Sequence, residues 1–365
     1  MGLEFPSLAR SALNTRSTIA WKPFAIVVAL ALGLSACAGT ASSAPPQGRP
    51  NPIELRLGYF PNLTHAPGLV GIGTGEFQRS LGTDVKLIPT VFKAGPAAVE
   101  ALFAGSVDAA FIGPNPAVNA FAKSNGDAIR IVSGSTSGGA ALVVRTDIDK
   151  ADDLRGATVA SPQIGSTQDI SLRAWLKENG LTSGVTGAGE VSVVPQPNSQ
   201  TLDAFRQGRI DGAWVPEPWA TRLVREAGGR VLVDERDLWP DGKWATTVLV
   251  VRTDYLKASP DAISRLLSGL ERTIASIHAD PAEAQAVLND QIEAVTGKRI
   301  APEILNEAWG KVQFTTDPLP ESIRESADRA VAVDLLDPVD IDGIFDTDLL
   351  SESQTRSSRD SLEGK

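Results

Sequence analysis

Two stretches of this chain, 103 residues apart, carry the same pattern. Residues 105–112 and 208–215 both read glycine, any residue, aliphatic, aspartate, small, alanine, aromatic, aliphatic. The glycine suits the left-handed position that ends a helix, and the apolar run suits a buried strand. Two copies at a long spacing predict two similar lobes rather than a short-period solenoid.

A second repeat supports the first. Residues 142–147 and 249–254 both read Leu-Val-Val-Arg-Thr-Asp, 107 residues apart. Taken alone, this identity is also compatible with chance, or with a shared preference for a strand followed by a helix cap. Two repeats at nearly the same spacing favour two similar lobes.

Apolar strands alternate with helical stretches from residue 53 onward. Strands are predicted at 53–58, 85–89, 107–112 and 129–133, with helices at 67–81, 97–104 and 117–124. Such alternation is typical of α/β folds whose sheets are covered by helices. We therefore predict an α/β chain with two lobes, each a mainly parallel sheet flanked by helices, and two hinge crossings.

The repeats also suggest where the lobes begin and end. We place the first lobe at residues 53–147 plus 245–350 and the second at 148–244, with a cleft between them. A chain of 365 residues is long enough for two such bodies. Residues 351–365 are polar and are predicted to be a disordered tail.

The first residues have the features of a secretory signal. Three basic residues precede an apolar run at 24–34, which is too short to span a bilayer. The run is followed by Ser35, Ala36 and Cys37, the single cysteine, in a context that resembles a bacterial lipobox. We predict a lipoprotein signal peptide at 1–36, lipidation of Cys37, a flexible tether at 37–52 and anchoring to the outer face of the cytoplasmic membrane. The alternative is an ordinary signal peptide with an incidental cysteine.

Composition and missing motifs exclude several functions. A formal net charge of −10 argues against nucleic-acid binding. Two histidines and one cysteine argue against a multi-ligand metal site. The glycines at 71–75 do not have the spacing of a dinucleotide fingerprint, and Thr136 stands where a nucleophile elbow needs serine. The aspartates between 337 and 348 fit a solvated acidic end better than a calcium loop. We predict no enzyme, no metal and no cofactor.

The remaining candidates are loops between a strand end and a helix start. Helix N-termini offer free N–H groups and bind anions, and ligands of open sheets lie at the strands' carboxyl ends. Ser166 and Thr167 are the sharpest such anion cradle, although helix capping alone also explains them. We predict that the ligand-binding residues are Tyr59, Asn62, His65, Phe92, Asn115, Ser135, Gly138, Gly139, Ser166, Thr167, Trp214 and Glu217.

Several short motifs resemble one known family when read in order. The opening segment at 57–67 resembles the start of substrate-binding proteins of nitrate, taurine and aliphatic-sulfonate ABC importers. Further landmarks of that family match at 105–108, 137–145, 153–156, 217–219 and 341–346. The resemblance implies a type II periplasmic-binding-protein fold, a small-molecule ligand held between two lobes, and delivery to an ABC permease and its ATPase. It implies no cofactor.

The resemblance leaves the ligand open. Relatives that bind thiamine-pyrimidine precursors share the fold, but their cysteine-rich motif is absent here. Aromatic residues in the candidate loops slightly favour a sulfonate or taurine-like organic anion over nitrate or bicarbonate. Two other classes remain: a sensor lipoprotein whose cleft binds a signalling ligand, and an enzyme on the same fold.

Overall fold

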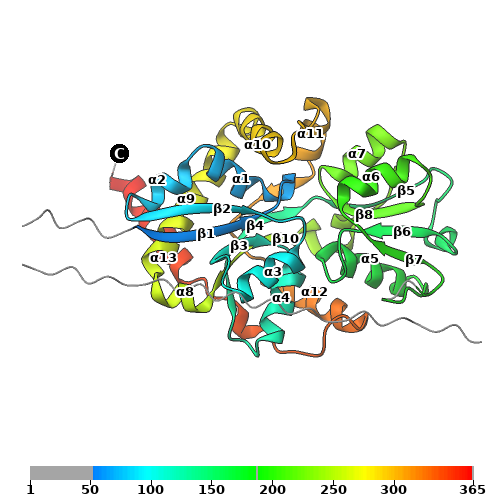
Figure 1. Ribbon diagram of the computed structural model, residues 1–365, viewed down its shortest axis with the longest axis horizontal. Coiled ribbons are helices and arrows are strands. Elements are labelled where there is room, and N and C mark those ends of the chain that lie inside the picture. The colour runs from blue at the N-terminus through cyan, green and yellow to red at the C-terminus, as the bar shows by residue number, and fades with distance from the viewer. Residues whose placement is uncertain (1–51, 186–187, 364–365) are drawn as a thin grey trace, which may run out of the picture. The chain divides into compact units, whose positions relative to one another are not determined.

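Two β-sheets organise the part of the chain that the structure describes. This computed structural model describes residues 52–185 and 188–363, which belong to one compact unit (Figure 1). Sheet 1 has the order β11-β4-β10-β3-β1-β2. Its strands are β1 (Ile53–Tyr59), β2 (Val85–Val91), β3 (Ala109–Ile112), β4 (Ile129–Gly138), β10 (Ala245–Arg252) and β11 (Val312–Phe314). The signal peptide, Cys37 and nearly all of the tether lie outside the described residues.

Sheet 2 repeats the arrangement of sheet 1. Its order is β7-β6-β8-β5-β9, and its strands are β5 (Ala140–Val144), β6 (Thr158–Ser161), β7 (Ser192–Pro195), β8 (Gly212–Pro216) and β9 (Arg230–Asp234). The strands β1, β2 and β3 pair in parallel, as do β6, β7 and β8. In each sheet the next strand, β10 or β5, then runs antiparallel to both of its neighbours.

The two sequence repeats occupy equivalent strands. The glycine-to-aliphatic pattern contributes β3 in sheet 1 and β8 in sheet 2, and the Leu-Val-Val-Arg segments contribute β10 and β5. The predicted α/β class with two helix-flanked sheets is confirmed. Both sheets are mixed, because the Leu-Val-Val-Arg strands run against their neighbours.

One predicted boundary is wrong. We placed residues 140–147 in the first lobe, but β5 pairs with β8 and β9 of sheet 2. Only Gly139 separates β4 from β5, and both Gly138 and Gly139 have left-handed φ angles of 76° and 78°. The chain therefore passes from sheet 1 to sheet 2 at this glycine pair. It returns through two short 3-10 turns, Glu235–Leu238 and Pro240–Gly242, which lead into β10.

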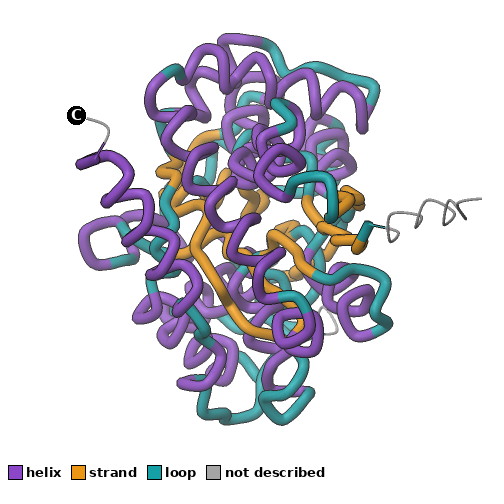
Figure 2. Tube along the Cα trace, turned by 90° about the vertical axis from the view of Figure 1, so that its left-hand side faces the viewer, coloured by secondary structure: helices purple, strands orange, loops and turns teal. Residues whose placement is uncertain are grey.

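Helices cover both faces of sheet 1, because its strands are apolar on both sides. In β10, Leu249 and Val251 contribute to one buried cluster, whereas Val248 and Val250 contribute to another. Figure 2 shows helices on both sides of the strands. The first cluster includes residues of α1 (Ala66–Gly73), α2 (Glu76–Leu81), α9 (Pro260–Ala279), α10 (Pro281–Thr296) and α11 (Pro302–Trp309). The second includes residues of α3 (Gly95–Phe103), α4 (Pro114–Lys123) and α12 (Pro320–Ala332).

Sheet 2 is covered in the same way by three helices. α5 (Thr167–Glu178) contributes Leu172 and Leu176 to one buried cluster. α6 (Asn198–Arg206) and α7 (Trp219–Ala227) contribute Phe205 and Leu223 to the other. No helix among residues 52–185 and 188–363 is long and apolar enough to cross a membrane.

The predicted disordered tail is wrong over most of its length. Residues Asp348–Glu363 form α13, and α8 (Thr253–Ala258) precedes the long helix α9 on which α13 packs. Leu350 is buried, and Ser353 lies 2.8 Å from Ser268 Oγ and donates to Glu271 Oε2 at 2.6 Å. The sequence looked unstructured because these contacts are mostly polar.

Candidate functional site

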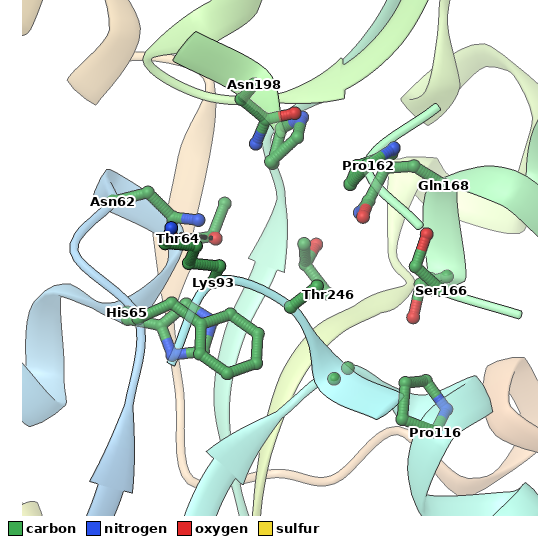
Figure 3. A pocket seen from close by; sticks show the side chains of 16 residues that line it. Asn62, Thr64, His65, Lys93, Pro116, Pro162, Ser166, Gln168, Asn198 and Thr246 are labelled. Carbon is green, nitrogen blue, oxygen red and sulfur yellow. Dashed lines mark hydrogen bonds between the residues drawn. The ribbon is translucent and has the colours of Figure 1, made fainter. Parts of the chain in front are cut away.

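A pocket lies where loops of sheet 1 meet loops of sheet 2 (Figure 3). Its empty volume is about 410 Å³, including its open mouth. In Figure 3, Asn62, Thr64 and His65 lie opposite Pro162, Ser166 and Gln168. Its full lining is Phe60, Asn62, Thr64, His65, Lys93, Ala94, Gly95, Gly113, Pro116, Pro162, Ser166, Thr167, Gln168, Asn198, Pro216 and Thr246. We call this the inner pocket.

Five helix starts reach the inner pocket. The carboxyl ends of parallel strands meet at one edge of a sheet, so the helices that follow them begin at that edge. The lining therefore includes the first residues of α3, α4, α5 and α6, and the short turn Leu63–His65 that leads into α1. The first N–H groups of a helix have no partner within the helix, and its N-terminus carries partial positive charge. This arrangement favours an anion.

Thr167 and Ser166 play different parts at the start of α5. The Ser166 hydroxyl accepts from the Asp169 N–H at 3.3 Å, so it caps the helix. Thr167 is only 3% exposed, and its Oγ1 has no hydrogen-bond partner among the described residues. A buried hydroxyl without a partner costs free energy unless a ligand or water satisfies it. The Thr167 hydroxyl is thus available to a ligand, as are His65 Nδ1 and Asn198 Oδ1, which also have no partner among the described residues.

A buried carboxylate fixes the loop that carries these two residues. Asp169 accepts from Ser161 Oγ at 2.7 Å, from the Gly165 N–H at 3.0 Å and from Arg173 Nε at 3.1 Å. Both charged side chains are almost fully buried and form an ion pair, while Arg173 Nη2 has no partner among the described residues. Gly165 has a φ of 74°, which a residue with a side chain rarely adopts. The end of β6 and the start of α5 are therefore held in one geometry.

The sheet 1 side of the pocket presents neutral polar groups. Thr64 Oγ1 donates to Asn62 Oδ1 at 2.7 Å, which leaves the Asn62 amide N–H groups as donors. The His65 ring packs on Phe60 with centroids 4.2 Å apart. Burial lowers the pKa of His65 to about 3, so the ring is neutral at pH 7. Its Nδ1 has no partner among the described residues.

Lys93 is the one charged side chain among the sixteen lining residues. Neither aspartate nor glutamate lines the inner pocket, so a cationic group would meet no opposite charge there. Apolar atoms of Phe60, Pro116 and Pro162 complete the walls. The pocket can bind a small anion through N–H and O–H donors, with one cation and an apolar surface beside them.

Four of the twelve predicted ligand-binding residues meet in this pocket: Asn62, His65, Ser166 and Thr167. Phe92 packs in the core beside Phe60, and its ring approaches Gly58. Asn115 donates to the Ser326 carbonyl at 2.9 Å and accepts from its hydroxyl at 2.7 Å. Neither residue lines the pocket.

Tyr59 and Trp214 do not line the inner pocket. Tyr59 lies in the sheet 1 core with the α1 and α9 side chains. Trp214 is fully buried, and its indole N–H donates to Glu235 Oε2 at 2.6 Å. Both rings point into a core because alternate residues of a covered strand face its helices.

The other predicted residues lie at the passage between the sheets. Gly138 and Gly139 form the crossing itself, and Ser135 lies in β4 with a buried hydroxyl that has no partner among the described residues. Glu217 donates its N–H to the Gly139 carbonyl and accepts from Lys311 Nζ at 3.1 Å. Burial raises the pKa of Glu217, and the nearby Lys311 charge opposes that shift. These residues hold the connection rather than line the pocket.

Sequence reasoning missed Asn198, Gly113 and Thr246. Asn198 begins α6 after β7, which is equivalent to the start of α3 after β2. The repeat could therefore have identified this position. Gly113 lies between β3 and α4, and a glycine there has no side chain that indicates a role in a site. Thr246 lies at the start of the antiparallel strand β10, where no strand-to-helix pattern points to a site.

Solved structures share this fold. The alkanesulfonate-binding protein SsuA from Xanthomonas axonopodis pv. citri, bound to MOPS, aligns with a TM-score of 0.65 and 20% identity, over 80% of this chain and 96% of that one. The periplasmic nitrate-binding protein NrtA from Synechocystis PCC 6803 aligns with a TM-score of 0.69 and 16% identity, over 84% and 89%. The chain thus has the fold of periplasmic binding proteins.

Sequence comparison gives the family. The taurine-binding periplasmic protein of Escherichia coli K12 is 31% identical over 197 residues, which cover 54% of this chain and 58% of that protein. The match thus spans less than two thirds of that relative. A model of the NMT1-like family matches residues 48–289, which is more than half of the chain. The chain therefore belongs to the NMT1-like family.

Proposed function

We propose that this protein is the extracytoplasmic substrate-binding component of an ABC-type importer for a small organic anion. The observation that carries the proposal is the inner pocket, where five helix starts and the unpartnered Thr167 hydroxyl surround a space with one lysine and no carboxylate. The protein would hold its ligand there and deliver it to a permease and its ATPase. The relatives, which are named for binding taurine, sulfonates and nitrate, support this role.

Among such anions, an alkanesulfonate fits the pocket best. Its three oxygens match several N–H and O–H donors, and its carbon chain matches the apolar walls formed by Phe60, Pro116 and Pro162. Nitrate and bicarbonate have no apolar part to place there. Taurine adds an ammonium group, and an unpaired buried charge is costly. We therefore infer that ethanesulfonate binds more tightly than taurine.

We also propose that the mature chain is lipid-anchored through Cys37 to the outer face of the cytoplasmic membrane. The support is the basic region, the short apolar run and the cysteine that follows it. An anchor of this kind keeps the binding protein close to its permease.

Thermal unfolding with a ligand panel tests the function. Ethanesulfonate, taurine, nitrate and bicarbonate are each added to the purified protein. A ligand at 100 times its Kd stabilises the native state by about 2.7 kcal/mol, so ethanesulfonate should raise Tm clearly. No stabilisation by any of the four anions would contradict the proposal, and recovery of a chemically altered ligand would indicate an enzyme.

A matched pair of variants ties the effect to the inner pocket. Thr167→Val removes the pocket hydroxyl but keeps the side-chain shape. Loss of one charge-assisted hydrogen bond should weaken ethanesulfonate binding by roughly 10- to 100-fold. Thr136→Val is the control, because Thr136 Oγ1 is also buried without a partner in the described structure but lies outside the pocket. Equal affinities of the two variants would place the anion elsewhere.

A further inference from the structure

A larger cavity adjoins the inner pocket. Its empty volume is about 1340 Å³, including its open mouth. Four residues line both cavities: Phe60, Asn62, Lys93 and Asn198. The two cavities therefore meet at these four residues. We call the larger one the outer cavity.

The outer cavity is lined by helices and loops from the sheet 1 side and from the sheet 2 side. One wall comes from the starts of α6 and α7, which follow strands of sheet 2. The opposite wall comes from the end of α10 and the loop that leads to α11, on the sheet 1 side. Figure 1 shows α11 beside α7, and these two helices are in contact. A ligand that occupies the outer cavity therefore touches both sides at once.

Apolar side chains line part of the outer cavity. Leu202 and Ile292 are buried and line the cavity from opposite walls. Trp219 adds an aromatic surface, and the Arg222 guanidinium lies 4.7 Å from the centre of its ring, which holds the indole in place. The outer cavity thus offers an apolar surface that a carbon chain can contact.

The charged side chains that line the outer cavity are five cations and one carboxylate, Asp203, which lies 3.7 Å from Arg206. The arginines that line the cavity already have carboxylate partners: Arg206 and Arg222 pair with Glu226, and Arg299 pairs with Asp290 and Glu293. Lys93 and Lys298 also line it, and neither has an ion-pair partner within residues 52–185 and 188–363. Lys298 is therefore an unpaired cation that lines the outer cavity and not the inner pocket.

We propose that the ligand is an elongated organic anion with two acidic ends. One acidic head lies among the helix starts of the inner pocket, the carbon chain passes between Leu202 and Ile292, and the second acidic end lies at Lys298. This inference rests on the proposed function and extends it by assigning the outer cavity to the distal half of the same ligand.

Calorimetric titration of three sulfonates with the full chain tests the proposal. Hexanesulfonate should bind on the order of tenfold more tightly than ethanesulfonate, because its longer chain buries more apolar surface. The disulfonate with a sulfonate at each end of hexane should bind about threefold more tightly again, through Lys298. This last gain should decrease at high salt, since Lys298 is exposed.

Two lysine variants separate the contributions. Lys298→Gln should remove the advantage of the disulfonate over hexanesulfonate and leave ethanesulfonate binding unchanged. Lys257→Gln is the control, because Lys257 lies on α8, outside both cavities, and it should change none of the three affinities. Equal affinities for the three sulfonates, or an equal loss for all three in Lys298→Gln, would overturn the inference. Absence of binding by all three would overturn the proposed function itself.

Discussion

Gly113 and Thr167 approach each other across the inner pocket from different sheets. A Cβ atom at position 113 would lie 2.3 Å from Thr167 Oγ1, which is far too close. Gly113 has φ −70° and ψ 157°, which any residue can adopt. Glycine is therefore required there for space and not for backbone freedom.

This relationship predicts the effect of Gly113→Ala. The new methyl group should displace the Thr167 hydroxyl and weaken ethanesulfonate binding by about tenfold, which corresponds to roughly 1.4 kcal/mol. The free energy of unfolding should change little, because the backbone is unstrained. Gly310→Ala is the control, since its Cβ would come no closer than 3.6 Å to any neighbour. Calorimetric titration and urea unfolding of both variants give the two quantities; wild-type affinity in Gly113→Ala would refute the role of the close approach.

The two aspartates of the repeat, Asp108 and Asp211, should differ in how much their arginine partners contribute to stability. Asp108 accepts from Arg56 Nε at 2.9 Å and Nη2 at 2.6 Å, and its side chain is 2% exposed. Asp211 meets Arg145 Nε at 3.3 Å and is 37% exposed. Asp108→Asn should therefore cost about 3 kcal/mol and Asp211→Asn about 1 kcal/mol, because exposed pairs are weak. Urea unfolding tests the order, and equal costs would contradict it.

A buried carboxyl near the return crossing should make stability depend on pH. Burial raises the pKa of Glu235 to about 7, although hydrogen bonds from Ser171 and Trp214 oppose the shift. The unfolded chain loses this proton near pH 4.5, so between pH 4.5 and 7 the native state binds more protons. The free energy of unfolding should thus fall as pH rises through this range, by up to about 3 kcal/mol.

Glu235→Gln isolates that contribution, because glutamine keeps the shape and does not titrate. Urea unfolding at pH 4.5 and at pH 8 should show wild type losing stability relative to the variant as pH rises. His65, whose pKa is lowered, contributes a slope of opposite sign below pH 6.5, but it is present in both proteins and cancels in the comparison. A constant difference between the two proteins would show that the pKa of Glu235 is the same in the folded and the unfolded chain, which would contradict the prediction.

Membrane attachment should depend on the sulfur atom of Cys37. Cys37→Ala removes the thiol that would receive the lipid, and a buried acyl chain contributes about 0.8 kcal/mol per methylene. The variant should leave the membrane fraction and appear in the soluble fraction. Fractionation of cells that express each form measures this, and equal retention would rule out the lipid anchor.

The repeats in the sequence were sufficient to predict the two sheets, but we misplaced one crossing. Residues 142–145 had to occupy the position in sheet 2 that residues 249–252 occupy in sheet 1, so the equivalence itself assigned β5 to sheet 2. The same logic applied to Trp214, which is equivalent to Phe111, and both are fully buried. Treating the aromatic as a pocket wall ignored that a strand covered by helices buries its large side chains.

Part of the inner pocket forms only where segments that are far apart in the sequence come together, and no local sequence pattern encodes such contacts. Strand ends and helix N-termini are visible in sequence, and they directed the prediction to Asn62, His65, Ser166 and Thr167, which line the inner pocket. Asn115 follows the same rule but turns to Ser326, a partner 211 positions away. Which polar side chain remains unpartnered is decided by such tertiary contacts.

A crystal structure with bromoethanesulfonate tests the central claim most directly, because the bromine and sulfur positions can be located by anomalous scattering. The account predicts the sulfonate in the inner pocket, within hydrogen-bond distance of Thr167 Oγ1 and the N–H groups at the start of α5, with the bromine directed toward the outer cavity. A sulfonate bound outside the inner pocket, or an inner pocket that stays empty at saturating ligand, would contradict it.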